Sequence, residues 1–140
     1  MLKFGCVFAL LAAAVAASSP ADAAGALAVG STSDVSKDGI AVGTSVNYDT
    51  PEEARSAALK RCSEYKPAPK AAAMCQSVGT FKSECYAVSF DPKAGTPGAG
   101  WAIASTKTLA EERALENCKA TAGATRREYC RIEESKCDEK

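Results

Sequence analysis

The sequence predicts an α+β fold in which duplicated strand–strand–helix–strand units form one disulfide-stapled domain, with two helices packed on antiparallel sheet. Three observations lead to this prediction. Short apolar runs recur 61 positions apart, at residues 26–29 and 87–90 and again at 39–42 and 100–103. Each half has a helix-start signal followed by small residues at helical spacing. Each half also contains three cysteines in the same order.

Residues 1–23 have the pattern of a secretory signal peptide. Lys3 supplies a positive charge, residues 4–17 are almost wholly apolar, and Ala21 and Ala23 form an Ala-x-Ala cleavage pattern. A membrane anchor is the alternative, but this apolar run is shorter than the about 20 residues that a membrane span needs. We therefore expect cleavage after Ala23, no membrane span in the mature chain, and a secreted or periplasmic protein.

We expect residues 24–140 to form a single duplicated domain, with repeat 1 at about 25–85 and repeat 2 at about 86–137. A solenoid array needs three or more repeats, so two units predict one intertwined domain. A long turn is expected between the first two strands of each repeat, at residues 30–39 and 91–100. Two prolines and three glycines punctuate the second of these turns.

Both predicted helices begin at a threonine. Thr50 is the expected N-cap of the first helix, with Pro51 at the first helical position and Glu53 closing a capping box. Thr108 and Glu111 repeat this box in the second half. Small residues at three- and four-residue spacing then give each helix a face that can lie close to a sheet.

The last strand of each half is expected to carry the second cysteine of that half, at about residues 74–81 and 129–133. Between the first helix and its strand, residues 66–70 contain two prolines. We expect a stiff exposed loop there, because proline cannot continue a helix.

Removal of the signal peptide takes away one of the seven cysteines, Cys6, and an even number remains. An even number in an exported small domain predicts three disulfides. A zinc site is the alternative, but zinc ligands come in close pairs and the shortest interval here is seven, from Cys130 to Cys137. A catalytic thiol would need a base, and the chain has no histidine. The six expected disulfide cysteines are Cys62, Cys75, Cys85, Cys118, Cys130 and Cys137.

Six cysteines allow 15 connectivities, and the duplication reduces them. A pseudo-two-fold axis exchanges Cys62 with Cys118, Cys75 with Cys130, and Cys85 with Cys137. Among the pairings that this exchange preserves, bonds from helix to following strand favour Cys62–Cys75 and Cys118–Cys130. The remaining bond, Cys85–Cys137, is then expected to cross the pseudo-axis from the end of one repeat to the end of the other.

The order of these motifs resembles a family of exported bacterial proteins, the domain of unknown function 4189. The resemblance is carried by residues 39–42 and 100–103, by the Thr-x-x-Glu helix starts, and by Ala-Leu-x-x-Cys at 58–62 and 114–118. It spans residues 25–137 and implies an α+β domain with disulfides between helix and strand, but no chemistry. Ile40 stands where family members carry an aromatic residue, and the loop at 66–70 is longer than usual.

The charge balance and the missing histidine exclude several functions. Lys plus Arg and Asp plus Glu are both 17, so no basic footprint indicates nucleic-acid binding. Without histidine there is no Ser-His-Asp or Cys-His nucleophile system and no histidine-ligated zinc. We expect no catalytic residues, no cofactor and no metal.

Other candidate residues have structural explanations. The acid pairs at 52–53 and 111–112 could cleave glycosides, but carboxylates in the first turn of a helix are favoured by the helix dipole. Asp34 and Asp38 lack the ligand pattern of a calcium loop and predict a polar turn. The only basic cluster is formed by Arg126, Arg127 and Arg131. Glu128, Glu133 and Glu134 alternate with these arginines, which favours a solvated strand face over a nucleic-acid patch.

Three functional classes remain. The first is an exported interaction module of unknown ligand, a binder or an enzyme inhibitor, whose partner is a protein or an envelope component. The second is a structural protein of the cell envelope, and the third, less favoured, is a carboxylate-dependent hydrolase. Trp101, the only tryptophan, is a possible contact residue for a partner, with a core position as the alternative.

Overall fold

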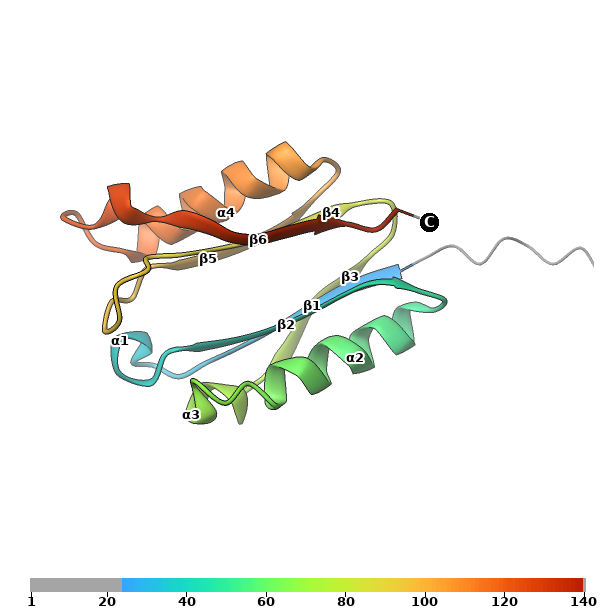
Figure 1. Cartoon of the computed structure of the whole chain (residues 1–140), viewed down its shortest axis with the longest axis horizontal. Coiled ribbons are helices and arrows are strands. Elements are labelled where there is room, and N and C mark those ends of the chain that lie inside the picture. Colours follow the sequence, from blue (N-terminus) through green and yellow to red (C-terminus); the bar gives the residue numbers. More distant parts are fainter. Residues whose placement is uncertain (1–23, 140) are drawn as a thin grey trace, which may run out of the picture.

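The computed structural model describes residues 24–139, which form four layers in the order helix, sheet, sheet, helix (Figure 1). Helix α2 (Pro51–Ser63) covers the outer face of the first sheet, and helix α4 (Lys107–Thr121) covers the outer face of the second. The predicted signal peptide at 1–23 lies outside the described residues.

Each sheet has three antiparallel strands, and the first strand of each half is central. The order is β2-β1-β3 in the first sheet and β5-β4-β6 in the second. The predicted fold class is therefore confirmed, with the strands divided between two sheets. The strands are β1 (Ala24–Ser31), β2 (Ile40–Tyr48), β3 (Gln76–Phe81), β4 (Cys85–Phe90), β5 (Ala99–Ala104) and β6 (Arg131–Cys137). The shorter helical turns are α1 (Val35–Asp38), α3 (Pro69–Ala72) and the 3₁₀ turn η1 (Arg127–Tyr129).

Side chains alternate along β1 between two different environments. Ala26 and Ala28 face α2, whereas Leu27 and Val29 face the second sheet, because successive strand residues point to opposite faces. Large apolar side chains therefore fill the space between the sheets, and small ones fill the space under the helices. The inter-sheet core contains Leu27, Val29, Phe81, Tyr86 and Val88, with Ile40, Val42, Val46, Phe90, Trp101 and Ile103 partly buried at its rim.

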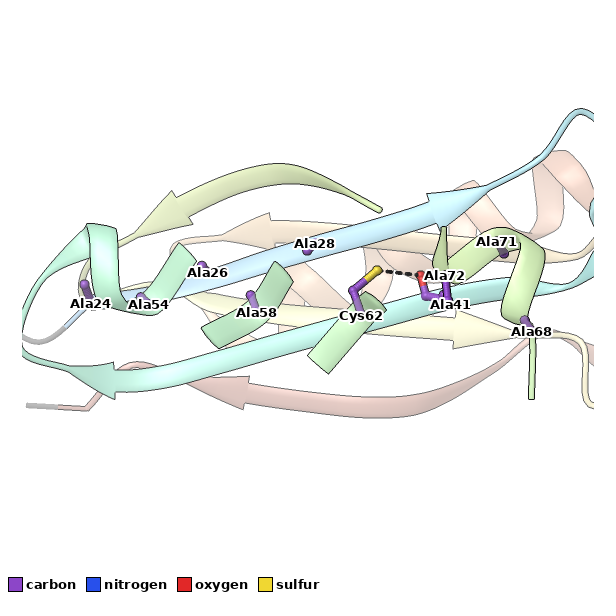
Figure 2. Packing of buried hydrophobic residues seen from close by; sticks show 10 residues of the cluster. All are labelled: Ala24, Ala26, Ala28, Ala41, Ala54, Ala58, Cys62, Ala68, Ala71 and Ala72. Atoms are coloured by element: carbon purple, nitrogen blue, oxygen red, sulfur yellow. Dashed lines mark hydrogen bonds between the residues drawn. The ribbon is translucent and has the colours of Figure 1, made fainter. Parts of the chain in front are cut away.

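The small-residue face of α2 lies directly on the first sheet. Figure 2 shows Ala54, Ala58 and Cys62 on the helix turned toward alanines of β1 and β2. A Cβ atom added to Gly43 of β2 would overlap the Ala58 carbonyl oxygen. Helix and strand thus approach so closely that only glycine fits at this crossing.

The second half repeats this close approach at Gly100, where a Cβ atom would overlap the Ala114 carbonyl oxygen. Gly43 pairs with Ala28, and Gly100 pairs with Ser89. The structural counterpart of Gly100 is therefore Gly43 and not Gly39, so the predicted match between residues 39–42 and 100–103 is wrong by four residues. Between counterpart positions the first half has four more residues, because 12 residues separate Val29 from its partner Val42, whereas 8 separate Phe90 from its partner Ala99.

The N-cap of α2 is as predicted: the Thr50 hydroxyl accepts a hydrogen bond from the Glu53 N–H at 3.2 Å. The predicted cap of α4 at Thr108 is wrong. Thr106 is the N-cap, because its backbone is extended and its hydroxyl accepts from the Leu109 N–H at 3.2 Å. Thr108 lies inside the first turn. Glu111 does not serve as a cap and accepts a hydrogen bond from the Ser135 hydroxyl on β6.

The last strands differ from their predicted bounds. Cys75 and Cys130 immediately precede β3 and β6 rather than lying in them, and β6 continues to Cys137 because it pairs with the whole of β4. Residues 66–70 are not simply an exposed loop. Pro69 opens helix α3, where its fixed φ angle suits the first helical position, and Ala68 before it is buried.

The three disulfides join the predicted pairs, Cys62–Cys75, Cys85–Cys137 and Cys118–Cys130. The first and third tie the end of a helix to the residue before the last strand of its half. The prediction that Cys85–Cys137 crosses a pseudo-axis is wrong. Cys85 opens β4 and pairs with Cys137 of the neighbouring β6, so this bond lies within the second sheet.

Candidate functional site

A groove lies between the two halves on the side where β2 faces β6. It has two parts, one of about 400 Å³ at the loop end and one of about 210 Å³ between the strands. Ile40, Tyr65 and Phe90 line both parts and form an apolar centre. Tyr65, which follows α2, is 41% exposed although it is a large aromatic residue. The groove is therefore built from residues far apart in the sequence and contributed by both halves.

The loop-end part is formed by α1 and by the connection between β4 and β5. Its two carboxylates already have cationic partners: Asp38 lies 3.0 Å from the Lys70 ammonium, and Asp91 accepts a hydrogen bond from the Arg126 guanidinium at 2.7 Å. Hydrogen bonds from Arg126 hold the pKa of Asp91 well below its usual range, although burial opposes this shift. Both carboxylates are thus internal contacts of the loops.

Lys37 and Lys93 also line this part of the groove, one from each half. Both side chains are exposed, and within residues 24–139 neither takes part in an ion pair. Lys37 helps to lower the pKa of Asp38, but Asp38 and Asp91 each have a nearer cation in Lys70 and Arg126. The loop end therefore has an excess of positive charge.

The other end of the groove contains the carboxylates of Glu133 and Glu134 on β6. Glu134 lies 2.7 Å from the Lys136 ammonium and within 3.5 Å of the Thr44 hydroxyl. Burial raises the pKa of Glu134, but polar interactions with Lys136, Tyr86 and Thr44 outweigh it and hold the pKa below its usual value. Glu134 is therefore ionised at neutral pH.

Tyr86 lies beneath this end of the groove and links the two sheets. It is 1% exposed, and its hydroxyl donates to the Thr44 hydroxyl at 3.1 Å. Burial raises the pKa of Tyr86 well above that of free tyrosine. A neutral phenol therefore lies beside an ionised carboxylate near neutral pH.

The two helices cover the edges of β2 and β5 with different side chains. On β5, the Thr121 hydroxyl contacts both the N–H and the carbonyl oxygen of Ala99 at 2.9 Å, and the Asn117 amide donates to the Trp101 carbonyl. On β2, Arg61 at the position of Asn117 binds the Thr44 carbonyl. Tyr65 occupies the position of Thr121.

This difference leaves part of the β2 edge open at the groove. Val42 is the β2 counterpart of Ala99, and its N–H and carbonyl point away from β1, because the hydrogen-bonding direction alternates along an antiparallel strand. No side chain from the described part of the chain binds these two groups. A hydrogen-bond donor and acceptor thus stand beside the apolar centre.

The acid pairs at 52–53 and 111–112 do not come together. The first pair lies on α2 and the second on α4, and these helices are the two outermost layers of the molecule (Figure 1). Glu111 is bound to Ser135. The geometry does not bring a carboxylate from one pair near a carboxylate from the other.

Trp101 lies on β5 opposite Val88 and is partly buried at the rim of the inter-sheet core. β5 and β6 are the two opposite edge strands of the second sheet, and the groove lies on the β6 side. Trp101 is therefore not part of the groove. Asp34 caps α1 by accepting from the Lys37 N–H at 3.1 Å, which fits the predicted polar turn.

The arginines at 126–131 do not form the solvated strand face that was predicted. Arg126 precedes η1, and Asp91, with which it pairs, has a side chain that is 0% exposed. The guanidinium also stacks 4.3 Å from the centre of the Tyr129 ring. Only Arg131 lies on β6.

The groove residues were not recognised from the sequence. One signal was present for Tyr65, which lies three residues after Cys62 as Thr121 lies three residues after Cys118. An aromatic residue replaces a small polar one at matching positions of the two halves. No comparable signal exists for Phe90 or Lys93, because their role depends on the packing of one half against the other.

Comparison with known protein families identifies the family of this chain. Residues 24–137 match the family described as domain of unknown function 4189, so the chain belongs to this family, and the resemblance seen in its motifs is confirmed. No curated protein and no solved structure matches it. Three disulfides are typical of a protein in an oxidising compartment outside the cytosol. Within residues 24–139, no helix has the length and hydrophobicity needed to cross a membrane.

Proposed function

We propose that the protein is an exported interaction module, secreted or periplasmic, that binds a protein or an envelope component through the groove and carries out no catalysis. The observation that supports this proposal is the exposed Tyr65, which lines the groove together with Ile40 and Phe90 and lies in a groove with open hydrogen-bonding groups. Aromatic anchors beside a few polar groups are typical of binding sites.

Hydrogen bonds outside the groove also link the two halves, and a link of this kind favours binding by lowering its entropy cost. Asp138 is 5% exposed, and its carboxylate accepts hydrogen bonds from the Asn47 N–H at 2.9 Å and the Ser83 N–H at 3.4 Å. Asn47 and Ser83 both have positive φ angles, 62° and 51°. The chain end after β6 therefore connects the end of β2 to the turn before β4, and so links the halves.

A matched pair of variants tests the groove. The oxidised, exported protein is used as bait in envelope and culture fractions, as wild type, as Tyr65→Asp and as Met74→Asp. Met74 is a comparable exposed apolar residue, 53% accessible, that lies outside the groove. We expect the same partner with wild type and Met74→Asp and its loss with Tyr65→Asp. A partner retained equally by all three proteins would contradict binding through the groove.

The absence of catalysis is tested separately. We expect Glu53→Gln and Glu111→Gln to leave partner binding unchanged, because these residues lie in the outer helices and away from the groove. Loss of a measurable hydrolytic activity in either folded variant would favour the carboxylate-dependent hydrolase instead. Protein that stays with the wall or membrane fraction through sequential extraction, independently of Tyr65, would favour a structural envelope protein.

If the protein is exported, its first residue and the state of its cysteines can be predicted. The mature chain should begin near Ala24, which is the first residue of β1, and all six remaining cysteines should be paired. Intact mass with thiol labelling under non-reducing conditions measures both. Retention of residues 1–23, or a labelled thiol without reductant, would contradict this prediction.

A further inference from the structure

The groove has opposite charges at its two ends. At the loop end, Asp38 is paired with Lys70 and also lies in the field of Lys37, and Asp91 is paired with Arg126. Lys37 and Lys93 therefore leave this end with an excess of positive charge. The strand end has Glu133, an exposed carboxylate for which residues 24–139 supply no cation. A ligand that spans the groove meets positive charge at one end and negative charge at the other.

The centre of the groove can accept an apolar side chain of a ligand, and the backbone of that ligand can lie beside the β2 edge. Ile40, Tyr65 and Phe90 provide the apolar contact shared by both parts of the groove. The N–H and carbonyl of Val42 provide a donor and an acceptor on the edge of β2. An extended peptide presents the complementary acceptor and donor to such an edge, and its side chains occupy the neighbouring pockets.

We propose that the groove binds an extended peptide segment of a partner protein, with acidic side chains at the loop end, an apolar or aromatic side chain at the centre and a basic side chain at the Glu133 end. This inference rests on the proposed function and specifies the chemistry of the ligand. Electrostatic complementarity of this kind sets the direction in which a segment lies and excludes segments of uniform charge.

Synthetic peptides labelled with fluorescein test the charge order by anisotropy on the oxidised full chain at low salt. All have about eight residues and a Leu-Phe centre, and they differ in their ends: acidic–basic in both chain directions, acidic–acidic, and basic–basic. We expect one of the two mixed peptides to bind roughly tenfold more tightly than either uniform peptide, with the advantage reduced by salt. Equal binding of all four peptides would overturn the proposal.

Charge-reversal variants of the protein show which end of the peptide contacts the lysines and which end contacts Glu133. Lys37→Glu combined with Lys93→Glu should weaken binding of the preferred mixed peptide by roughly fivefold, as expected for exposed pairs, and should improve the basic–basic peptide. Glu133→Lys should instead improve the acidic–acidic peptide. Lys119→Glu and Glu128→Lys are matched controls, because both residues are exposed and lie outside the groove. Equal effects in the control variants would overturn the assignment of the ends.

The two proposals fail in different ways. If the bait experiment identifies a Tyr65-dependent partner but all four peptides bind alike, the interaction module stands and the extended, charge-ordered ligand is wrong. If no Tyr65-dependent partner is found and no peptide binds, both proposals are wrong.

Discussion

The two halves of the molecule place a disulfide-closed loop against the same end of a sheet, but they hold it there with different chemistry. In the first half, Gly30 lies near the end of β1, and a Cβ atom on it would overlap the Ala71 carbonyl oxygen of α3. In the second half, Asp91 follows β4 and is bound by Arg126. One loop packs through small apolar residues, and the other is held by a buried ion pair.

This difference shows that the fold requires the loop to be anchored but not a particular interaction. Close packing of Gly30 against α3 leaves no room for a side chain and does not depend on protonation. The Asp91–Arg126 pair occupies more space, depends on ionisation and is oriented by the Lys93 N–H, which donates to Asp91 at 3.0 Å. The halves should therefore respond alike to changes in shared elements and differently to changes at these anchors.

The largest effect is expected from the disulfide that has no counterpart in the first sheet. Replacing both Cys85 and Cys137 with alanine opens a loop with a sequence separation of 52, and should lower the free energy of unfolding by about 4 kcal/mol in the chain-entropy account. Removing Cys118–Cys130, with a separation of 12, should cost about 3 kcal/mol. Urea unfolding of the oxidised variants measures both. A larger loss from the shorter loop would show that strain or denatured-state structure decides the order.

The glycines at the helix crossings test whether the halves are equivalent. Gly43→Ala and Gly100→Ala should each destabilise the fold by about 3 kcal/mol or more, because the new methyl group meets helix backbone that cannot move away. Gly79→Ala is the control, since its Cβ atom would lie 3.4 Å from the end of the flexible Ile103 side chain. Denaturant midpoints give the comparison. If one crossing tolerates alanine, the two helices do not approach their sheets equally closely.

The helix caps should give smaller and equal losses. Thr50→Ala and Thr106→Ala each remove the acceptor for one N–H group of the first turn, which should cost about 1 kcal/mol. Thr108→Ala should have almost no effect, because Thr108 lies within α4 and not at its cap. Thermal and urea unfolding of the three variants decide this. A loss at Thr108 equal to that at Thr106 would place the start of α4 two residues later.

The last expected effect is the loss of stability of the second-half loop in acid. It is absent at neutral pH, and it distinguishes the two halves. The pKa of Asp91 is lower in the folded protein than in the unfolded chain, chiefly because of the Arg126 hydrogen bonds. Its stabilising contribution is therefore fully present above the unfolded value of about 3.9 and is lost as the pH falls toward the folded value. Amide exchange below pH 4 should show earlier loss of protection around residues 91–98 and 123–130 than around α3.

Asp91→Asn provides the control for the acid experiment. This variant lacks the ion pair with Arg126 at every pH, so protection around residues 91–98 should be lower throughout but should no longer fall more steeply in acid than around α3, because the group that titrates has been removed. The exposed Asp38–Lys70 pair of the first half also has a carboxylate with a lowered pKa, held by hydrogen bonds from Lys70 and Thr32. Equal acid sensitivity of both loops in the wild type would show that this surface pair matters as much as the buried one.

Features that depend on short stretches of chain were predicted well from the sequence. The Thr50 cap with Pro51 behind it and the small-residue helix faces follow from spacing within a few turns of the chain. The presence of three disulfides follows from the even number of cysteines. The second cap was misplaced because Thr106 and Thr108 both precede an apolar helical pattern, and only the extended backbone at Thr106 distinguishes them.

The pairing of Cys85 with Cys137 was predicted correctly on a symmetry argument that the structure overturns. The two cysteines are not exchanged by the duplication. They are neighbours on adjacent strands, and the register of β4 against β6 brings them together. Sheet register is a long-range property, so residue counts along the chain could not reveal it.

By itself, the sequence determined the α+β class, the family, the small-residue helix faces and the set of paired cysteines, because each depends on local periodicity or on residue type. Only the tertiary structure decided that the sheets stack on large side chains while the helices pack on alanine and glycine, and that Tyr65 and Phe90 form one groove with Glu133. The physical reason is that stacking two halves creates contacts between residues that have no fixed relation along the chain.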